Sequence, residues 1–467
     1  MSSSRDSLKL PEGIWRVVCV AAIGSFMAQL DATVVNVSLP DIATTLQASF
    51  STVQWVVSGY LLALALTLPL NGWLVGRIGA KAVYLWCFGA FVLASGLCAL
   101  AWSVSSLIIF RLLQGMAGGL MAPMAQMMVA RAAGRHLSRV ASAIVVPILL
   151  APLLGPVIAG QILSVASWRW IFLLNIPVGL LALVLAAVFL PDERHIERPR
   201  PLDLAGLALL APALAGFLYG IDHAHQMVGL VLLCAALVMF VLYCCLARKK
   251  GDRALIDLRL FHAPVFSTSA TIMFLINGVS FAGQMLLPVW LIQACGIAPD
   301  RTGLIMLPLG LGMMCTYPLV GYLTEHFGIR KFTMCGAFCA GAGTLLLAFL
   351  ACKGLTMSLL AVALFLRGAG TGAIGIPVMS ASYASVTKAD IPMATTTLNI
   401  VQRIGGPVLS TLCGTFLGWQ QSVASIANPL MPVFAKVFIF LFIFHAVLFL
   451  MTCRLPQTLP EPELSAR

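Results

Sequence analysis

The chain has 467 residues, of which 60% are hydrophobic and only 9% charged, and its mean hydropathy is +1.00. Because a soluble domain carries roughly 25% charged residues, this composition excludes a cytosolic enzyme, a secreted domain, a DNA-binding protein and a disordered chain. The net charge of +12 lies in short basic clusters between apolar runs, as in the loops of membrane proteins. We therefore expect a polytopic all-α membrane protein that contacts the lipid bilayer and has no nucleic-acid partner.

Fourteen apolar runs are long enough to cross a bilayer, since a helix needs about 20 residues to span about 30 Å of hydrocarbon. They are far too long for the strands of a membrane barrel. In chain order the predicted spans are residues 14–39, 51–74, 81–101, 104–127, 138–163, 167–190, 202–220, 226–247, 264–293, 301–324, 331–352, 356–383, 392–420 and 432–454.

The basic residues predict the orientation of these spans. With the N-terminus in the cytoplasm, 21 of the 28 Lys and Arg residues fall in inside segments, four fall outside and three fall within spans. One missed helix would exchange the two sides for every later loop. The asymmetry therefore favours fourteen spans with both termini in the cytoplasm.

An internal repeat divides the chain into two halves. The sequence GWLVGRIGAK at residues 72–81 recurs as GYLTEHFGIR at 321–330, each time after the second span of a six-span block, and a weaker echo joins 114–124 to 367–378. Many secondary transporters consist of two repeated halves, which open a central site to the two sides of the membrane in turn. The expected organisation is a cytoplasmic tail, an N-terminal six-helix bundle, a linker with two extra spans, a C-terminal six-helix bundle and a second cytoplasmic tail, at residues 1–13, 14–190, 191–263, 264–454 and 455–467.

Asp31 is the one acidic residue of the sixteen that falls inside a predicted span, away from its ends. A carboxylate in hydrocarbon costs several kcal/mol and persists only for a reason. Burial disfavours the charged form of an acid, whereas a neighbouring cation favours it. An acid under both influences can load and release a proton. The alternative is a fixed ion pair that only holds two helices together.

Arg111 is the expected partner of Asp31. At about 1.5 Å per residue, Asp31 lies about 22 Å from the cytoplasmic end of its helix, and Arg111 about 10 Å from the external end of the fourth span. In a layer about 30 Å thick these depths nearly coincide. We expect an Asp–Arg pair or a water-bridged relay. The alternative is that Arg111 extends to the outer headgroups.

Two arginines near mid-depth in the second half, Arg367 and Arg403, have no acid in their spans to neutralise them. We expect them to face water, Gln side chains, backbone carbonyls or an anionic ligand. His445, the one histidine well inside a span, is expected to be a packed neutral ring. A lone polar residue in a span is more often an interhelical hydrogen bond than a ligand contact. The candidates for a substrate cavity between the halves are Phe26, Gln29, Asn36, Gln114, Asn277, Gln284, Arg367, Asn399, Gln402 and Arg403.

Signatures of catalysis and metal binding are missing from the sequence. It has no HExxH, no Walker GxxxxGK[ST] and no GxSxG in a strand–turn–helix setting. The 13 cysteines lie almost entirely in apolar stretches and form no CxxC pair. We expect no enzyme, no metal site and no cofactor. Without an ATPase segment, transport must draw on an ion gradient or an accessory protein.

Four stretches carry a family resemblance. They are LDATVVNVSLP at 30–40, RLLQG at 111–115, GPVIAG at 155–160 and SWRWIFLLNIPVG at 167–179. Together they resemble the major facilitator superfamily, and within it the fourteen-helix drug:proton antiporters of the EmrB/QacA type. The resemblance covers essentially the whole chain and is stronger in the first half.

The resemblance implies roles for particular residues. It implies Asp31 as the proton-coupling acid, Arg111 as part of a proton relay, and close packing and bending of the fifth helix at its Gly and Pro residues. Gly76 departs from the family pattern, which has an acid there that helps to latch the cytoplasmic side. The latch is then weaker, or Glu325 in the second copy takes a larger share. The residues expected to act in conformational change are Gly72, Gly76, Arg77, Gly79, Lys81, Gly155, Pro156, Gly160, Glu325 and Arg330.

The sequence therefore predicts a proton-coupled antiporter of the bacterial inner membrane that exports small amphipathic or lipophilic molecules by alternating access, as in multidrug efflux and antibiotic resistance. One alternative is a proton-coupled importer, or a dedicated exporter of one metabolite such as a siderophore. A second is a membrane scaffold or sensor without transport. A third is one component of a tripartite efflux assembly that requires a periplasmic adaptor protein.

Overall fold

The structure is a computed structural model that describes residues 13–133, 158–191, 202–222, 226–297, 299–387, 390–423 and 430–457, and six further positions between 134 and 157. Within these residues the fold is helical and contains no β-strand. Twelve of the described helices or helix pairs are long and apolar enough to cross a membrane.

The described residues form α-helices from Ile14 to Thr452. They are α2 (Ile14–Thr45), α3 (Phe50–Thr67), α4 (Asn71–Ile78), α5 (Ala80–Ala99), α6 (Val104–Ala133), α8 (Arg169–Leu173), α9 (Asn175–Phe189), α10 (Leu204–Asp222), α11 (Met227–Lys250), α12 (Pro264–Gln293), α13 (Pro299–Ile305), α14 (Leu307–Phe327), α15 (Ile329–Lys353), α16 (Met357–Ala384), α17 (Ile391–Val423) and α18 (Leu430–Thr452). Short 3-10 turns lie at Leu68–Leu70, Gly251–Arg253 and Leu258–His262.

The twelve candidate spans coincide with twelve of the fourteen predicted ones. The fifth predicted span, 138–163, lies largely outside the described residues. The thirteenth, 392–420, coincides with α17, which has 33 residues but is less apolar than the twelve. Its first half carries the polar run Thr395–Thr397 together with Asn399, Gln402 and Arg403, which lowers its hydropathy.

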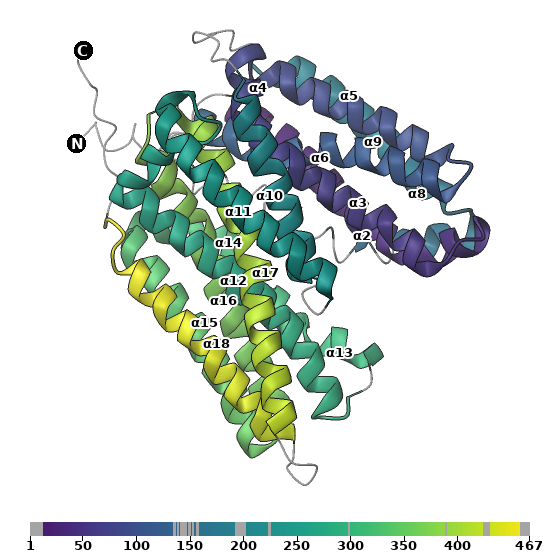
Figure 1. The fold of residues 1–467 in the computed structure, drawn as a ribbon. Helices are drawn as coiled ribbons and strands as arrows, with labels where there is room; N and C mark the ends of the chain where they lie inside the picture. The colour runs from purple at the N-terminus through teal and green to yellow at the C-terminus, as the bar shows by residue number, and fades with distance from the viewer. Residues whose placement is uncertain are drawn as a thin grey trace. The chain divides into compact units, whose positions relative to one another are not determined.

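Two compact units repeat the same helix packing (Figure 1). Unit 1 comprises Met1–Gly220, His225–Leu258 and Lys388–Thr397, and unit 2 comprises Ile221–Ala224, Arg259–Thr387 and Leu398–Arg467. In unit 1, α6 packs against α2, α3 and α5, and α9 packs against α2 and α5. In unit 2, α16 packs against α12, α14 and α15, and α18 packs against α12 and α15. These pairings correspond one to one, so the repeat seen in the sequence is also a repeat of structure.

A glycine with positive φ marks the same turn in both units. Gly79 joins α4 to α5 with φ 83° and ψ 155°, and Gly328 joins α14 to α15 with φ 80° and ψ 156°. Side chains beyond glycine rarely occupy this region of backbone conformation, at a cost of about 1–3 kcal/mol. The two copies of the loop motif therefore keep glycine here for a backbone reason.

The extra helices α10 and α11 are joined by a carboxylate. The Lys250 ammonium at the end of α11 donates to Asp203 Oδ1, just before α10, at 2.5 Å. The amides of Gly206 (2.8 Å) and Leu255 (3.3 Å) also donate to the Asp203 carboxylate. Asp203 therefore caps α10 and holds it to the end of α11, within unit 1.

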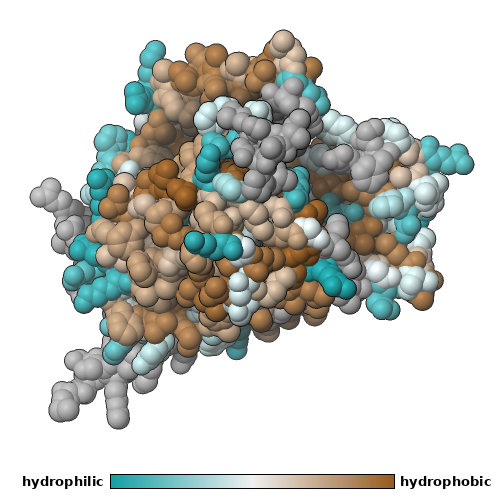
Figure 2. Space-filling model, turned by 90° about the horizontal axis from the view of Figure 1, so that it is seen from below, coloured by the Kyte–Doolittle hydropathy of each residue, from teal (hydrophilic) through white to brown (hydrophobic). Residues whose placement is uncertain are grey.

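The described surface is rich in exposed apolar side chains (Figure 2). Trp86 and Leu93 on α5, Val188 on α9 and Val231 on α11 are each more than half exposed. Helices with apolar outward faces and internally bonded backbones fit a lipid environment. The chain is a multi-pass membrane protein.

We predict that Gly79→Ala lowers the melting temperature of the purified protein, because alanine is strained at φ 83°. The expected loss is about 1–3 kcal/mol. The matched control is Gly76→Ala, three residues earlier in α4, where an added Cβ meets nothing within 4 Å. Thermal unfolding in detergent checks both variants, and equal melting temperatures for the two would contradict the prediction.

Candidate functional site

A buried polar centre lies inside unit 1, around the carboxylate of Asp31 on α2. Arg111 Nη1 on α6 donates to Asp31 Oδ2 at 2.6 Å, and both side chains are buried. Asn175 Nδ2, the first residue of α9, donates to Asp31 Oδ1 at 2.6 Å, and Gln114 Nε2 donates to the same oxygen at 3.3 Å. The carboxylate is therefore bound by three side chains from two other helices.

The guanidinium of Arg111 is held on several sides. Its Nη1 also donates to Gln114 Oε1 at 2.8 Å, and its Nε donates to the Val56 carbonyl of α3 at 3.2 Å. The Tyr60 ring lies 4.3 Å from the guanidinium carbon, and the Phe172 ring 5.5 Å. Aromatic faces at these distances attract a cation. Arg111 Nη2 is buried with no hydrogen-bond partner among the described residues.

Ser95 on α5 forms a second layer behind the ion pair. Its hydroxyl donates to the Phe172 carbonyl at 2.9 Å and accepts from Gln114 Nε2 at 3.2 Å and Asn175 Nδ2 at 3.1 Å. Cys98 Sγ, one turn along α5, lies 3.6 Å from Gln114 Oε1. Each amide that donates to Asp31 thus has a second acceptor within reach.

The polar centre is enclosed by apolar side chains. Those next to it or one turn away include Leu30, Val34, Val56, Leu107, Trp168, Ile171 and Phe172, all buried. Hydrogen bonds and ion pairs act more strongly in such a medium than in water, and an unpaired charge costs more. The site can therefore hold a charge pair, but not a lone charge, at low free energy.

The structure brings together Asp31 and Arg111, the two residues that sequence reasoning singled out. It adds Ser95 and Asn175, which that reasoning did not name as site residues. Gln114 belongs to this centre and is completely buried, whereas we expected it to line a cavity. The signal for Asn175 was available, because it is a lone amide within the apolar stretch 170–189. Ser95 gave none, since a serine is common in a membrane helix.

The other predicted cavity residues differ in exposure. Gln29, Asn36 and Gln284 are exposed, Phe26, Asn277, Gln402 and Arg403 are half-buried, and Arg367 and Asn399 are buried. The Asn36 amide donates to the Ala32 carbonyl of its own helix at 3.0 Å.

Arg367 is the centre of a second buried polar group, in unit 2. Its Nη2 donates to the Val279 carbonyl of α12 at 2.6 Å, and its Nη1 has no partner among the described residues. The guanidinium lies against Gly283, where any Cβ would overlap it. Across α15 and α18, Thr344 Oγ1 and His445 Nε2 are 3.4 Å apart. We expected Arg367 to face water, Gln side chains, backbone carbonyls or an anionic ligand. Of these, the structure shows a backbone carbonyl.

The fifth-helix motif is only partly described. Gly155 lies against Thr33 of α2, so closely that a Cβ would overlap the threonine hydroxyl. Thr33 is two residues from Asp31, and this contact brings the fifth-helix region next to the polar centre. A Cβ on Gly160 would meet nothing within 4 Å, and Pro156 lies outside the described residues.

The loop-motif residues lie at the ends of helices. Gly76 and Arg77 are exposed, and the Arg77 guanidinium is 5.5 Å from the Trp73 ring. Gly72 would bring a Cβ into ordinary contact with Met393 and Thr396. Glu325 is exposed near the end of α14.

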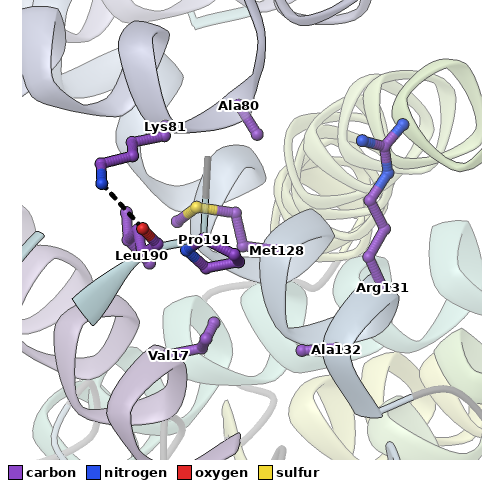
Figure 3. Close-up of a pocket in the computed structure, with 8 residues that line it drawn as sticks. All are labelled: Val17, Ala80, Lys81, Met128, Arg131, Ala132, Leu190 and Pro191. Carbon is purple, nitrogen blue, oxygen red and sulfur yellow. Dashed lines mark hydrogen bonds between the residues drawn. The ribbon is translucent and has the colours of Figure 1, made fainter. Parts of the chain in front are cut away.

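Lys81 and Arg330, at the same position of the two copies, make the same contact in their own units. Lys81 Nζ donates to the Leu190 carbonyl just after α9 at 2.8 Å (Figure 3). Arg330 Nε donates to the Leu455 carbonyl just after α18. In each case the start of the third helix of the unit is tied to the end of its sixth.

This fold and the sequence define the class of the protein. The profile of the Major Facilitator Superfamily matches residues 21–204 and 203–408. The chain belongs to this superfamily of membrane transporters, and the predicted resemblance is confirmed.

Relatives and solved structures agree with this membership. The chain is 32% identical over 429 residues to the multidrug resistance protein B homolog of Mycobacterium tuberculosis, covering 90% of this chain and 79% of the relative. It is 30% identical over 471 residues to a provisionally named multidrug resistance protein, MdtD, of Salmonella typhimurium, covering 96% of each. A double-tryptophan mutant of XylE shares the fold with a TM-score of 0.67, at 16% identity and over 97% of this chain and 98% of that one. The human organic anion transporter MFSD10 also shares the fold, with a TM-score of 0.63 at 17% identity, over 92% of this chain and 99% of that one.

We predict that the Asp31–Arg111 pair shows strong coupling in a double-mutant cycle. Removing one partner leaves a buried charge unpaired, which costs about 3–5 kcal/mol. Asp31→Asn and Arg111→Gln should each destabilise the protein, and the double variant should be more stable than Asp31→Asn alone. Chemical unfolding in detergent measures the three variants. Additive losses would show that the pair does not couple.

We also predict that Gly283→Ala destabilises unit 2, because the methyl group would overlap the Arg367 guanidinium. Overpacking of this kind costs about 1–3 kcal/mol. Gly310→Ala on α14, where a Cβ meets nothing within 4 Å, is the control and should be neutral or stabilising. Melting temperatures measured in detergent compare the Gly283→Ala and Gly310→Ala variants. A loss at Gly310 as large as that at Gly283 would refute the steric explanation.

Proposed function

We propose that this protein is a proton-driven exporter of small amphipathic and lipophilic molecules in the inner membrane of a bacterium, and not an enzyme. The names of its relatives support multidrug efflux as the activity. The proposal includes fourteen spans with both termini in the cytoplasm, which the distribution of basic residues favours. It also includes the proton gradient as the energy source and alternating access as the mechanism.

The observation that carries the proposal is the buried carboxylate of Asp31 and its donors. Asp31 is 2% exposed, and it is paired with a cation in an apolar interior. Ionisable residues in such places mark proton or ion pathways. No other acid lies within the described spans away from their ends.

Proton binding and the opening of the ion pair are linked in this proposal. A proton on Asp31 removes the negative charge that faces Arg111, so the guanidinium loses its partner. Gln114 and Asn175 can keep their hydrogen bonds to Ser95, and Arg111 keeps Gln114 Oε1 and the Val56 carbonyl. The donors around Asp31 therefore keep partners when it is neutral, but the charge of Arg111 is then unpaired in an apolar interior. That unpaired charge disfavours the closed arrangement, so protonation of Asp31 favours opening of the pair. Arg111 tunes the exchange by favouring release of the proton when the pair re-forms.

The energy from one proton suffices for export. A proton that crosses a potential of 100 mV supplies about 2.3 kcal/mol, and a tenfold concentration gradient of a neutral substrate needs about 1.4 kcal/mol. A monovalent cation exchanged for one proton moves no net charge, so the pH gradient alone would drive it.

We predict that adding a substrate to purified protein in weak buffer releases protons. The panel contains lipophilic cations and neutral amphiphiles, and a pH-sensitive dye reports the release. Asp31→Asn should abolish it. Asp41→Asn, which changes an exposed acid near the end of the same helix, should leave it intact.

Transport by protein reconstituted without any adaptor then tests the direction. Outward movement of a compound driven by an imposed proton gradient supports the exporter. Release that survives Asp31→Asn would place the proton site elsewhere and leave Asp31 as a structural ion pair. Inward movement together with protons would replace the antiporter by an importer.

A further inference from the structure

The chain after α18 folds back onto the turn between α14 and α15, within unit 2. Leu455 is completely buried there, and its carbonyl accepts a hydrogen bond from Arg330 Nε, 125 residues earlier in the chain. The Gln457 carbonyl accepts from the amide of Ile329 at 3.1 Å. We call residues 455–457 the strap, because they bind the end of α18 to the start of α15.

The strap supplies a cap that α15 otherwise lacks. The first four amides of an α-helix have no acceptor within the helix. The residue before α15 is Gly328, and no side chain caps this helix. The amide of Ile329 is the first of the four, and the Gln457 carbonyl accepts from it in place of a capping side chain. Since the loss of a cap destabilises a helix, the start of α15 depends on the strap.

The fit between the strap and the turn depends on Gly328. This residue has φ 80°, and a Cβ added to it would lie 2.6 Å from the Gln457 carbonyl oxygen. A side chain at position 328 would therefore push the strap away from the turn. The glycine that the backbone conformation requires also makes room for the capping carbonyl.

A Leu-Pro pair follows the sixth helix of each unit, as Leu190-Pro191 after α9 and Leu455-Pro456 after α18. A residue before proline avoids the helical conformation, so each helix ends before its pair. The leucine carbonyl then lies outside the helix, where a basic side chain can bind it. Lys81 does so in unit 1 (Figure 3) and Arg330 in unit 2.

α15 connects the strap to the buried polar group of unit 2. Gly336 and Gly343 lie so close to α16 that a Cβ on either would overlap its backbone. Further along α15, Thr344 Oγ1 is 3.4 Å from His445 Nε2 of α18. Because α15 is packed this closely against both neighbours, we expect its start and the surroundings of Arg367 to move together while the strap is in place.

We propose that the strap is a conformational lock that keeps the α14–α15 turn and the end of α18 together while the transporter changes state. With the strap in place, a change of state moves these helices of unit 2 as one body. Without it, the start of α15 frays and the movement is transmitted less completely. Conformational steps of this kind set turnover, so turnover falls while substrate affinity stays the same. Only this effect on turnover rests on the transport activity proposed above.

Hydrogen exchange tests the cap, with the full-length protein and a variant that ends at Arg454. Without the strap, the amides of residues 329–333 should exchange about tenfold faster, which corresponds to about 1.4 kcal/mol and is on the scale of a lost helix cap. The first turn of α5, residues 80–83, is the internal control and should not change. A variant that ends at Gln457 keeps the strap and should exchange like the full-length protein.

Transport by the same proteins measures the effect on function. The variant that ends at Arg454 should export with a several-fold lower kcat and an unchanged KM, whereas the variant that ends at Gln457 should match the full-length protein. Substrate-induced proton release, which tests Asp31, should persist in both variants. Release that is missing from the full-length protein as well would count against the proposed function, and hydrogen exchange would still decide whether the strap caps α15.

A second variant guards against a truncated chain that folds poorly. Pro456→Gly keeps the buried Leu455 and only loosens the backbone of the strap. It should raise exchange at residues 329–333 less than truncation does, and it should also lower kcat. Pro191→Gly loosens the counterpart in unit 1 and should leave exchange at 329–333 unchanged.

Two results would overturn the lock. One is equal exchange at residues 329–333 in the full-length protein, the variant that ends at Arg454 and Pro456→Gly. The other is faster exchange in these two variants with an unchanged kcat, because the strap would then be a helix cap without a role in transport.

Discussion

One buried ion pair constrains the first half of this transporter. A carboxylate and a guanidinium taken out of water are tolerated only when their mutual geometry is good and further hydrogen bonds support them. Asp31 and Arg111 therefore require the amides of Gln114 and Asn175 and the hydroxyl of Ser95, and these come from three other positions on α5, α6 and α9. The close approach of those helices follows from this requirement. In the proposed function, the same pair supplies the group that exchanges a proton.

The two halves share a packing scheme but differ in chemistry. Each unit builds a polar group from its first, third, fourth and sixth helices. In unit 1 the cation meets the Asp31 carboxylate, whereas in unit 2 Arg367 meets a carbonyl and lies against Gly283. Both halves thus contain a buried arginine. The buried acid of the described spans, Asp31, lies in unit 1. The proposed proton chemistry is correspondingly asymmetric.

The contacts of Lys81 and Arg330 extend this view to the helix ends. The family resemblance implies that such basic residues latch the cytoplasmic side together with an acid, which Gly76 replaces here. The structure shows each of them bound to a backbone carbonyl at the end of the sixth helix of its own unit. A carbonyl partner is independent of any acid. Each unit therefore keeps its third and sixth helices joined without the residue that position 76 lacks.

The sequence by itself determined the class of the protein, because an apolar run of about 20 residues admits few structures other than a membrane helix. The sequence alone predicted the twelve spans that the structure matches, the internal repeat and the acid at position 31, and the depth of Arg111 indicated its partner. Only the tertiary structure decided that Ser95 and Asn175 complete the centre, that Gln114 is buried in it and that Arg367 lies against Gly283. Those facts depend on the rotation of each helix about its axis. Side-chain packing between helices sets this rotation. The sequence pattern does not specify it, because a membrane helix is apolar both where it faces lipid and where it faces protein.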